Sequence, residues 1–286
     1  MNVQKRVVED ELESTIHILD APKSLKEAML YSLRAGGKRI RPLLMLATME
    51  AFQQDVQKGY PVACAVEMIH TYSLIHDDLP SMDDDDLRRG MPTNHKVFGE
   101  ALAILAGDGL LTYSFQVLSE MNGVSASDKI RLIRYLAQSA GPEGMVGGQV
   151  ADIEGEDTSL SLEDLMSIHE NKTGRLLTFS VVSAAILCGA SEQVIDELEE
   201  FSKHIGLAFQ IQDDILDIEG SEEKIGKPVG SDEINQKSTY PSLLGLEEAK
   251  AKLAEHSRLA KEILAKTGLH THLLMEIVDL IVKRDH

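Results

Sequence analysis

Only two of the 286 residues are cysteines, and both Cys64 and Cys188 lie in apolar surroundings. This pattern predicts two reduced core residues rather than a disulfide, as is usual in a reducing compartment. Residues 1–20 are charged throughout and lack the apolar core of a signal peptide. No apolar run approaches the roughly 18 to 20 residues that cross a bilayer. We therefore expect a cytoplasmic protein without a membrane span.

Positive charge is also scarce, because 28 Lys and Arg residues face 47 Asp and Glu residues, for a formal net charge of −19. Nucleic-acid binding requires a basic face, so this class of partner is not expected. The total charge should also repel a small anion, but salt screens charges over about 8 Å. Binding of an anionic substrate therefore depends on whether basic residues and a metal ion converge locally.

Linkers, repeats and low-complexity segments are absent, and no stretch shows the sustained alternation of a β-strand. Apolar residues instead recur at helical spacing. The helices that this spacing predicts span residues 24–33, 42–52, 61–79, 101–121, 128–140, 162–188, 192–218, 246–267 and 273–283. We therefore predict an all-α bundle that forms one domain over residues 1–286, with its site between facing helices.

Two clusters of aspartates dominate the polar residues. The first is the run of residues 77–86, which contains Asp77, Asp78 and Asp83, and the second contains Asp213, Asp214 and Asp217. So many anions favour a hard divalent cation, which suggests magnesium holding an anionic ligand. A solvated acidic loop or an incidental calcium site also accounts for the first cluster by itself. The second lies in an apolar helical segment, where carboxylates need a partner.

The spacing of the aspartates within each cluster differs between the two clusters. Asp213 and Asp217 are four residues apart, so a helix brings them to one face within reach of one metal ion. Asp77 and Asp83 would lie on different faces of an ideal helix, whereas Asp77 and Asp84 would align. Pro80 interrupts any continuous helix there. Geometry alone does not choose between Asp83 and Asp84.

These clusters and the segments around them resemble the trans-isoprenyl diphosphate synthases, and among these the bacterial farnesyl diphosphate synthases. The resemblance extends over most of the chain. Its other motifs are Gly36-Gly37-Lys38-Arg39-Ile40-Arg41-Pro42, Glu67-Met68-Ile69-His70, Leu87-Arg88-Arg89-Gly90, Asn171-Lys172-Thr173-Gly174, Gly226-Lys227 and Lys237-Ser238-Thr239-Tyr240-Pro241. It implies the isoprenoid synthase bundle with a central cavity. It also implies condensation of isopentenyl diphosphate with dimethylallyl and geranyl diphosphate to give farnesyl diphosphate.

The resemblance also assigns metal ligands and contacts to the allylic diphosphate. Asp77, Asp83 and Asp213 are expected to bind magnesium, three ions in all, with Asp78, Asp214 and Asp217 as further ligands or partners of the ligands. Magnesium acts there as a Lewis acid and a template for the leaving diphosphate. The expected contacts to the allylic diphosphate are Arg88, Lys172, Lys227 and, as a weaker candidate, Lys237.

Isopentenyl diphosphate is expected to bind through charge, without metal, at Lys38, Arg41, His70 and Arg89. Taken singly, Lys38 and Arg41 would be interpreted as an exposed basic turn, and His70 as a hydrogen-bonded core histidine. Their joint match to the family pattern favours the isopentenyl diphosphate pocket instead. Thr173, Gln210 and the Lys172 carbonyl, if Gly174 lets the helix deform, are expected to stabilise a carbocation. A threonine bonded to its own helix is the alternative for Thr173. No protein base is assigned, because the family uses the released diphosphate.

Product length is expected to depend on Tyr72, five residues or about 7.5 Å before Asp77 on a helix. By resemblance Tyr72 forms the floor of the pocket for the isoprenoid tail. Because Ser73 beside it is small, Tyr72 would have to limit product length alone. The alternative products or roles are geranylgeranyl diphosphate and a noncatalytic subunit of a heteromeric synthase. A homodimer, with helix 101–121 as one candidate interface, follows from the family. Lys283 and Arg284 either close over the diphosphate or remain solvated at a helix end.

Overall fold

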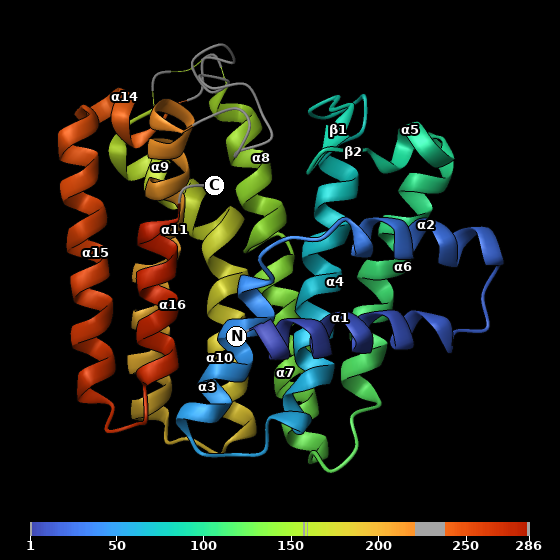
Figure 1. Cartoon of the computed structure of the whole chain (residues 1–286), viewed down its shortest axis with the longest axis horizontal. Coiled ribbons are helices and arrows are strands. Elements are labelled where there is room, and N and C mark those ends of the chain that lie inside the picture. Colours follow the sequence, from blue (N-terminus) through green and yellow to red (C-terminus); the bar gives the residue numbers. More distant parts are fainter. Residues whose placement is uncertain (1, 157, 159, 221–237, 285–286) are drawn as a thin grey trace. The chain divides into compact units, whose positions relative to one another are not determined.

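The computed structural model describes residues 2–156, 158, 160–220 and 238–284, and these residues are mostly helical (Figure 1). The prediction of an all-α fold is confirmed. Within these ranges the only strands are β1 (Leu87–Arg88) and β2 (Met91–Pro92), which pair antiparallel. The chain divides into two compact units, Met1–Leu46 with Asp55–Ile133, and Ala47–Gln54 with Arg134–His286. The assignment of one domain over residues 1–286 stays a prediction.

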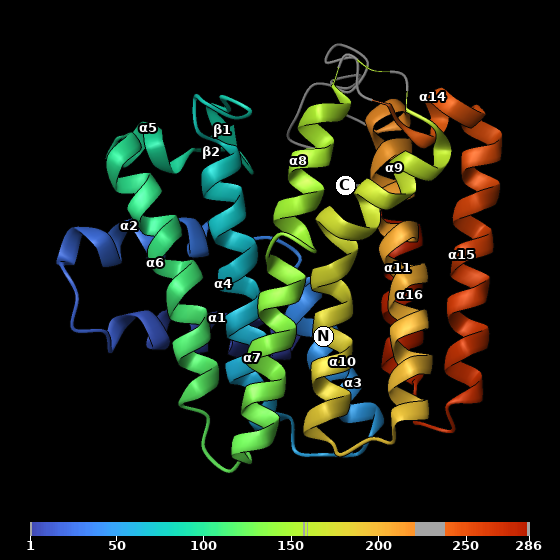
Figure 2. The ribbon, with the colours of Figure 1, turned by 180° about the vertical axis from the view of Figure 1, so that it is seen from behind.

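The first unit is built around α4 (Tyr60–Asp77), which buries 11 of its 18 residues. Its other elements are α1 (Asn2–His17), α2 (Lys23–Arg34), most of α3 (Ile40–Ala51), a 3-10 turn η1 (Val56–Gly59), α5 (Asn94–Phe98), α6 (Glu100–Ser119) and the start of α7 (Ala126–Ala140). The main neighbour of α4 is α6, and the two helices lie side by side in Figures 1 and 2. The first aspartate cluster begins where α4 ends.

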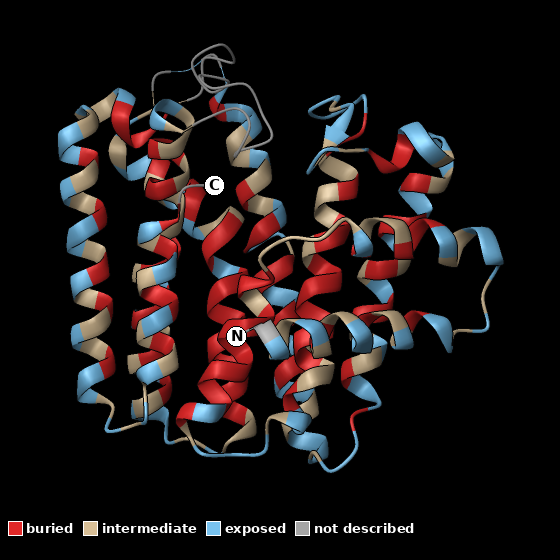
Figure 3. Ribbon diagram, in the orientation of Figure 1, coloured by how far each residue is buried: buried red, intermediate tan, exposed pale blue. Residues whose placement is uncertain are grey.

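The second unit contains the remaining helices. They are α8 (Met145–Gly155), α9 (Leu162–His169), the π-helical η2 (Glu170–Gly174), α10 (Arg175–Leu187), α11 (Glu192–Glu219), α14 (Tyr240–Leu244), α15 (Leu246–Lys266) and α16 (His272–Lys283). The long α11 packs on α10, α15 and α16. Figure 3 shows buried residues along α10, where every residue from Leu176 to Ile186 is buried. The apolar surface of this helix is therefore a core surface.

Most predicted helices have the expected bounds within a few residues, but the continuous helix over 162–188 is wrong. The structure divides this segment into α9, the π-helix η2 and α10. Ser161 begins α9 through a capping box with Asp164, in which each side chain bonds the other's backbone N–H. The π-helix then inserts an irregular turn around Lys172 and Thr173. Such π segments often mark functional sites.

The helix α6 differs from the sequence expectation in another respect. By length and composition it is apolar enough to cross a membrane, and the expectation of no such segment is therefore wrong. A core helix of a globular protein passes the same test. In the first unit α6 packs on α4, α2 and α5, and it buries Ala103, Ala106, Leu110 and Leu118.

Both cysteines are free thiols. Cys64 is buried in α4, and burial raises the pKa of its thiol. Cys188 is partly buried just after α10. The prediction that they form no disulfide is confirmed.

Candidate active site

The first aspartate cluster follows the C-terminus of α4. The helix ends at Asp77, and the chain turns back so that the Asp83 N–H donates to the Asp77 carbonyl at 2.8 Å. The Asp84 N–H donates to the Leu79 carbonyl at 3.1 Å, and Asp84 has a positive φ of 51°. The turn therefore brings the backbone of Asp83, rather than that of Asp84, beside Asp77. The carboxylates of Asp83 and Asp84 both lie on the exposed side of the turn.

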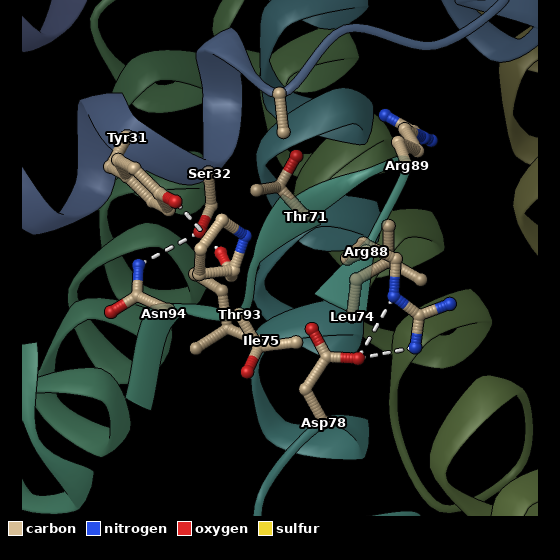
Figure 4. Close-up of a pocket in the computed structure, with 12 residues that line it drawn as sticks. Tyr31, Ser32, Thr71, Leu74, Ile75, Asp78, Arg88, Arg89, Thr93 and Asn94 are labelled. Atoms are coloured by element: carbon tan, nitrogen blue, oxygen red, sulfur yellow. Dashed lines mark hydrogen bonds and ion pairs between the residues drawn. The ribbon is translucent and has the colours of Figure 1, made fainter. Parts of the chain in front are cut away.

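Asp78 differs from the other aspartates of the first cluster because it is buried, with 3% of its surface exposed. Its carboxylate accepts hydrogen bonds from Arg88 Nε at 2.9 Å and from Arg88 Nη2. Arg88 Nη2 also lies 3.2 Å from Asp85. Figure 4 shows Asp78 and Arg88 pointing toward one another, with Arg89 directed elsewhere. This arrangement makes Asp78 a partner of Arg88 more readily than a ligand of a solvated cation.

Arg89 is directed by the short hairpin to the loop before α3. The register pairs Arg88 with Met91, and the turn uses positive φ angles at Arg89 and Gly90. Arg89 Nη1 donates to the Gly36 carbonyl. A Cβ on Gly37 would lie within 2.4 to 2.7 Å of the Arg89 guanidinium, so only glycine admits this contact. The glycine loop, which carries Lys38 and leads into Arg41 at the start of α3, is thereby joined to Arg89.

A buried ion pair underlies this loop, and the sequence did not indicate it. Arg39 Nη1 lies 2.6 Å from Glu67 of α4, and both side chains are almost fully buried. Arg39 also bonds the Leu33 carbonyl, and it has a positive φ of 53°. Both residues lie inside quoted motifs, but nothing in the sequence indicates that they pair. The pair fixes the loop on α4.

His70 lies one turn after Glu67 on α4. Burial, and then the positive charges of Arg41 and Arg89, hold the pKa of His70 well below its usual range. His70 is therefore neutral at physiological pH and offers a hydrogen bond without adding charge. The four predicted residues Lys38, Arg41, His70 and Arg89 all belong to the first unit, and the pKa of His70 records the proximity of Arg41 and Arg89.

Tyr72 is buried in α4, and its ring meets that of His76 edge-on, with centroids 5.6 Å apart and planes at 78°. Burial, with the charge of Asp77, raises the pKa of Tyr72 to about 12. Ser73 is half-buried, and its hydroxyl donates to the His70 carbonyl at 2.9 Å. Tyr72 is therefore an un-ionised apolar surface one turn before the first aspartate cluster.

In the second unit the aspartate cluster lies near the end of α11. Asp214 is buried and accepts a hydrogen bond from the Tyr240 N–H, the first of α14, at 2.8 Å. This bond uses a carboxylate at a helix N-terminus, where negative charge is favourable. Asp213 is more open, with 44% of its side chain exposed, and Asp217 is partly exposed one turn later. Asp213 and Asp217 therefore present their carboxylates more openly than Asp214.

Arg284, just after α16, pairs with the second cluster. Its Nη2 lies 2.8 Å from Asp213 and also donates to the Phe209 carbonyl, while its guanidinium stacks 3.9 Å above the Phe209 ring. The Gln212 side chain in turn donates to the Arg284 carbonyl at 3.0 Å. Of the two alternatives for Arg284, the solvated one is wrong, because only 6% of its side chain is exposed.

Lys172 and Thr173 lie in the π-helix, so the helix deforms before Gly174, as the glycine allows. Lys172 Nζ bonds Asp152 of α8 at 2.6 Å, a partner that the sequence did not indicate. Close packing is possible because a Cβ on Gly148 would lie 2.3 Å from the Lys172 N atom. Glycine Gly206 of α11 likewise meets the π-helix, and Gln210 follows it by one turn on the same helix face.

Lys227 and Lys237 lie outside the described residues. Within the ranges that the structure describes, no group of three His, Cys, Asp or Glu side chains is arranged to hold a metal ion. The exposed carboxylates are nevertheless the hard oxygen donors that magnesium prefers. Magnesium usually takes only one or two protein carboxylates and completes its shell with water and phosphate oxygens, so the donors present fit it.

Comparisons with known proteins agree with these features. The family model described as "Polyprenyl synthetase" matches residues 22–281. The chain is 59% identical to the farnesyl diphosphate synthase of Bacillus subtilis (strain 168), over 99% of this chain and 96% of that one. It is 49% identical to the chloroplastic geranylgeranyl pyrophosphate synthase of Capsicum annuum, over 94% of this chain and 74% of that one.

A solved structure has the same fold. The apo crystal structure of an FPP/GFPP synthase from Zymomonas mobilis superimposes with a TM-score of 0.87 and 36% identity, covering 98% of this chain and 96% of that one. Sequence and structure together therefore show that this chain belongs to the polyprenyl synthetase family.

Proposed function

We propose that this enzyme condenses isopentenyl diphosphate with dimethylallyl diphosphate and then with geranyl diphosphate, and that it releases (E,E)-farnesyl diphosphate. The observation that carries this proposal is the 59% identity to a curated farnesyl diphosphate synthase along the whole chain. The geranylgeranyl pyrophosphate synthase match is lower at 49%. Both aspartate clusters are also complete in this sequence, which disfavours a noncatalytic subunit.

Isopentenyl diphosphate is assigned to the cationic cluster of the first unit. Lys38, Arg41 and Arg89 supply positive charge, and the planar guanidinium groups suit a bidentate contact to phosphate. Neutral His70 donates a hydrogen bond to the same anion. The contact of Arg89 with the glycine loop supports this role, because it joins the hairpin that carries Arg89 to the loop that leads into Arg41 of α3.

The allylic diphosphate is assigned to Arg88, Lys172, Lys227 and Lys237, together with the aspartates and magnesium. Asp77 and Asp83 would hold magnesium from the first cluster, and Asp213, with Asp217, from the second. Asp78 and Asp214 would position these residues through Arg88 and α14. When bound, magnesium supplies Lewis-acid stabilisation of the leaving diphosphate. Three ions are expected from the family resemblance.

Carbon–oxygen cleavage leaves an allylic cation, which oxygen dipoles stabilise without attacking it. Thr173, Gln210 and the Lys172 carbonyl are assigned this role in the second unit. The π-helix supports it, because π segments interrupt the regular α-helical bonding and are frequent at functional sites. The electron pair of the isopentenyl double bond then forms the new carbon–carbon bond. The released diphosphate takes the proton, so no protein base is required.

The remaining parts of the proposal concern assembly. We infer a cytoplasmic homodimer in which residues 1–286 act as one polyprenyl synthase domain, with no membrane span and no nucleic-acid partner. The exposed apolar residues Ile104 and Leu105 of α6 support an intersubunit contact on this helix. Burial of these residues in a dimer would account for the apolar composition of α6.

Product analysis tests the function directly. The purified chain is incubated with isopentenyl and dimethylallyl diphosphate, with and without magnesium, and the products are identified by mass spectrometry. We expect farnesyl diphosphate only with magnesium. Asp83→Asn should lower kcat by about 10²-fold or more, as loss of one electrostatic stabiliser does. The matched control Asp10→Asn changes an exposed aspartate of α1 and should leave kcat unchanged. Geranylgeranyl diphosphate from the unaltered enzyme, or no prenyl product, would contradict the proposal.

A further inference from the structure

Tyr72 is linked to α6 through His76, and the link is confined to the first unit. Tyr72 and His76 are four residues apart on α4, so they share one helix face. Their rings meet edge-on at 5.6 Å. His76 Nε2 lies 3.1 Å from the Ile104 carbonyl and 4.0 Å from the Asp108 carboxylate, both on α6. The ring that contacts Tyr72 is therefore itself held by the neighbouring helix.

The space for the His76 ring is provided by a glycine. A Cβ on Gly107 would lie 2.2 Å from His76 Nε2 and 2.5 Å from its Cδ2, so no other residue fits while the ring keeps its place. Gly107 is buried in the middle of α6, where glycine lowers helix stability relative to alanine. Its Cα packs against the His76 imidazole, which takes no part in the proposed reaction. The glycine therefore has a packing function that outweighs its poor helix propensity.

An aromatic ring blocks a pocket only if it cannot rotate away from it. The core around Tyr72, which exposes 6% of its surface, restrains the ring in part, and the next residue, Ser73, lies on another face of the helix. The edge-on contact with His76 adds a specific restraint, since such aromatic pairs favour the paired arrangement. Holding the His76 ring on α6 thus favours one rotamer of Tyr72.

We propose that His76 and Gly107 determine product length by holding Tyr72 in the orientation that closes the tail pocket. This inference rests on the proposed function, because it concerns the product of that reaction. His76 and Gly107 are positioning residues that act through Tyr72 and touch no reacting atom. A side chain at position 107 would displace the His76 ring, release Tyr72 and admit one more isoprene unit.

The test compares two glycines of the same helix. Gly107→Ala displaces His76, whereas Gly109→Ala places its Cβ 3.4 Å from Met29 Sδ, the end of a flexible side chain. Both substitutions raise helix propensity equally. We expect Gly107→Ala to raise the ratio of twenty-carbon to fifteen-carbon product by about 2- to 12-fold, the range corresponding to loss of one aromatic pair. Gly109→Ala should leave the ratio unchanged.

A second variant, His76→Ala, keeps the proposal testable if Gly107→Ala does not fold. His76→Ala introduces no clash but removes the ring, so it should raise the same ratio. The double variant His76→Ala with Gly107→Ala should match His76→Ala alone, because the vacated space accepts the new Cβ. The ratio is insensitive to a loss of active enzyme or of kcat, which a merely structural role would cause.

Two outcomes separate the inference from the function on which it rests. Absence of any prenyl product from the unaltered enzyme would reject the proposed function. Farnesyl diphosphate as the only product of the unaltered enzyme and of both His76→Ala and Gly107→Ala would reject the positioning role while leaving the function intact. Equal ratios for Gly107→Ala and Gly109→Ala in folded protein would also reject it.

Discussion

Replacing Glu67 by glutamine tests the buried ion pair beneath the cationic loop. Arg39 and Glu67 expose 2% and 4% of their side chains, and the charged atoms lie 2.6 Å apart. Removing one member of a buried pair usually destabilises a protein by about 3–5 kcal/mol, because the other charge stays buried. Arg39 keeps its bond to the Leu33 carbonyl and a longer contact of 3.4 Å to Glu9. We therefore expect the lower end, a loss of about 3 kcal/mol.

Thermal and urea unfolding followed by circular dichroism measure this loss. For a protein of this size about 3 kcal/mol corresponds to a fall in Tm of roughly 6–12 °C. The matched control is Glu13→Gln, which breaks the exposed pair with Arg34, also 2.6 Å long but with 50% and 41% of the side chains exposed. Exposed pairs contribute about 0–1 kcal/mol, so this variant should unfold almost as the unaltered protein does.

A double replacement separates pairing from packing. Arg39→Met with Glu67→Met removes both charges and should be less destabilised than Glu67→Gln, since neither charge remains buried. If Glu67→Gln and Glu13→Gln lower the free energy of unfolding equally, the burial argument is refuted.

Three further predictions concern Tyr72, the buried His169 at the end of α9, and Arg284. Tyr72→Ala should yield geranylgeranyl diphosphate in the product assay. Release of farnesyl diphosphate alone would contradict the role of Tyr72 in limiting product length. Burial lowers the pKa of His169 to about 4, while the unfolded value is about 6.5. The stability that neutral His169 contributes is present above pH 6.5 and is lost as the pH falls, by about 2 kcal/mol at pH 5. His169→Phe should flatten this dependence in urea titrations at each pH. Arg284→Ala should tighten Mn²⁺ binding, followed by electron paramagnetic resonance, about two- to fivefold by releasing Asp213, and an unchanged affinity would contradict competition at that carboxylate.

Eight helices were predictable within a few residues from apolar spacing, because this signal is local, whereas α1 and α8 were not predicted. Ser161 and Ser191 begin two helices as capping residues. The irregular elements were not predicted. The π-helix Glu170–Gly174 depends on close packing of Gly206 and Gly148 against it, and residues far apart in the chain decide such contacts. The two-residue strands of the hairpin are too short for any alternation to be seen.

The candidate site was likewise predictable only in part. The identities of Asp77, Asp83, Asp213, Lys38 and His70 follow from motifs that can be read along the chain. The roles of their neighbours do not, because a sequence cannot indicate which carboxylate is buried. Only the folded chain distinguishes Asp78, paired with Arg88, from the exposed Asp83.

By itself the sequence determined the family, the helical architecture and the carboxylate and cationic chemistry, since these depend on residue type and on spacing within single helices. Tertiary structure decided the partners, namely Glu67 for Arg39, Asp152 for Lys172, Arg284 for Asp213 and Gly107 for His76. Each of these contacts joins separate helices or a helix and a loop. Its free energy comes from desolvation and close packing, which exist only after the chain has folded.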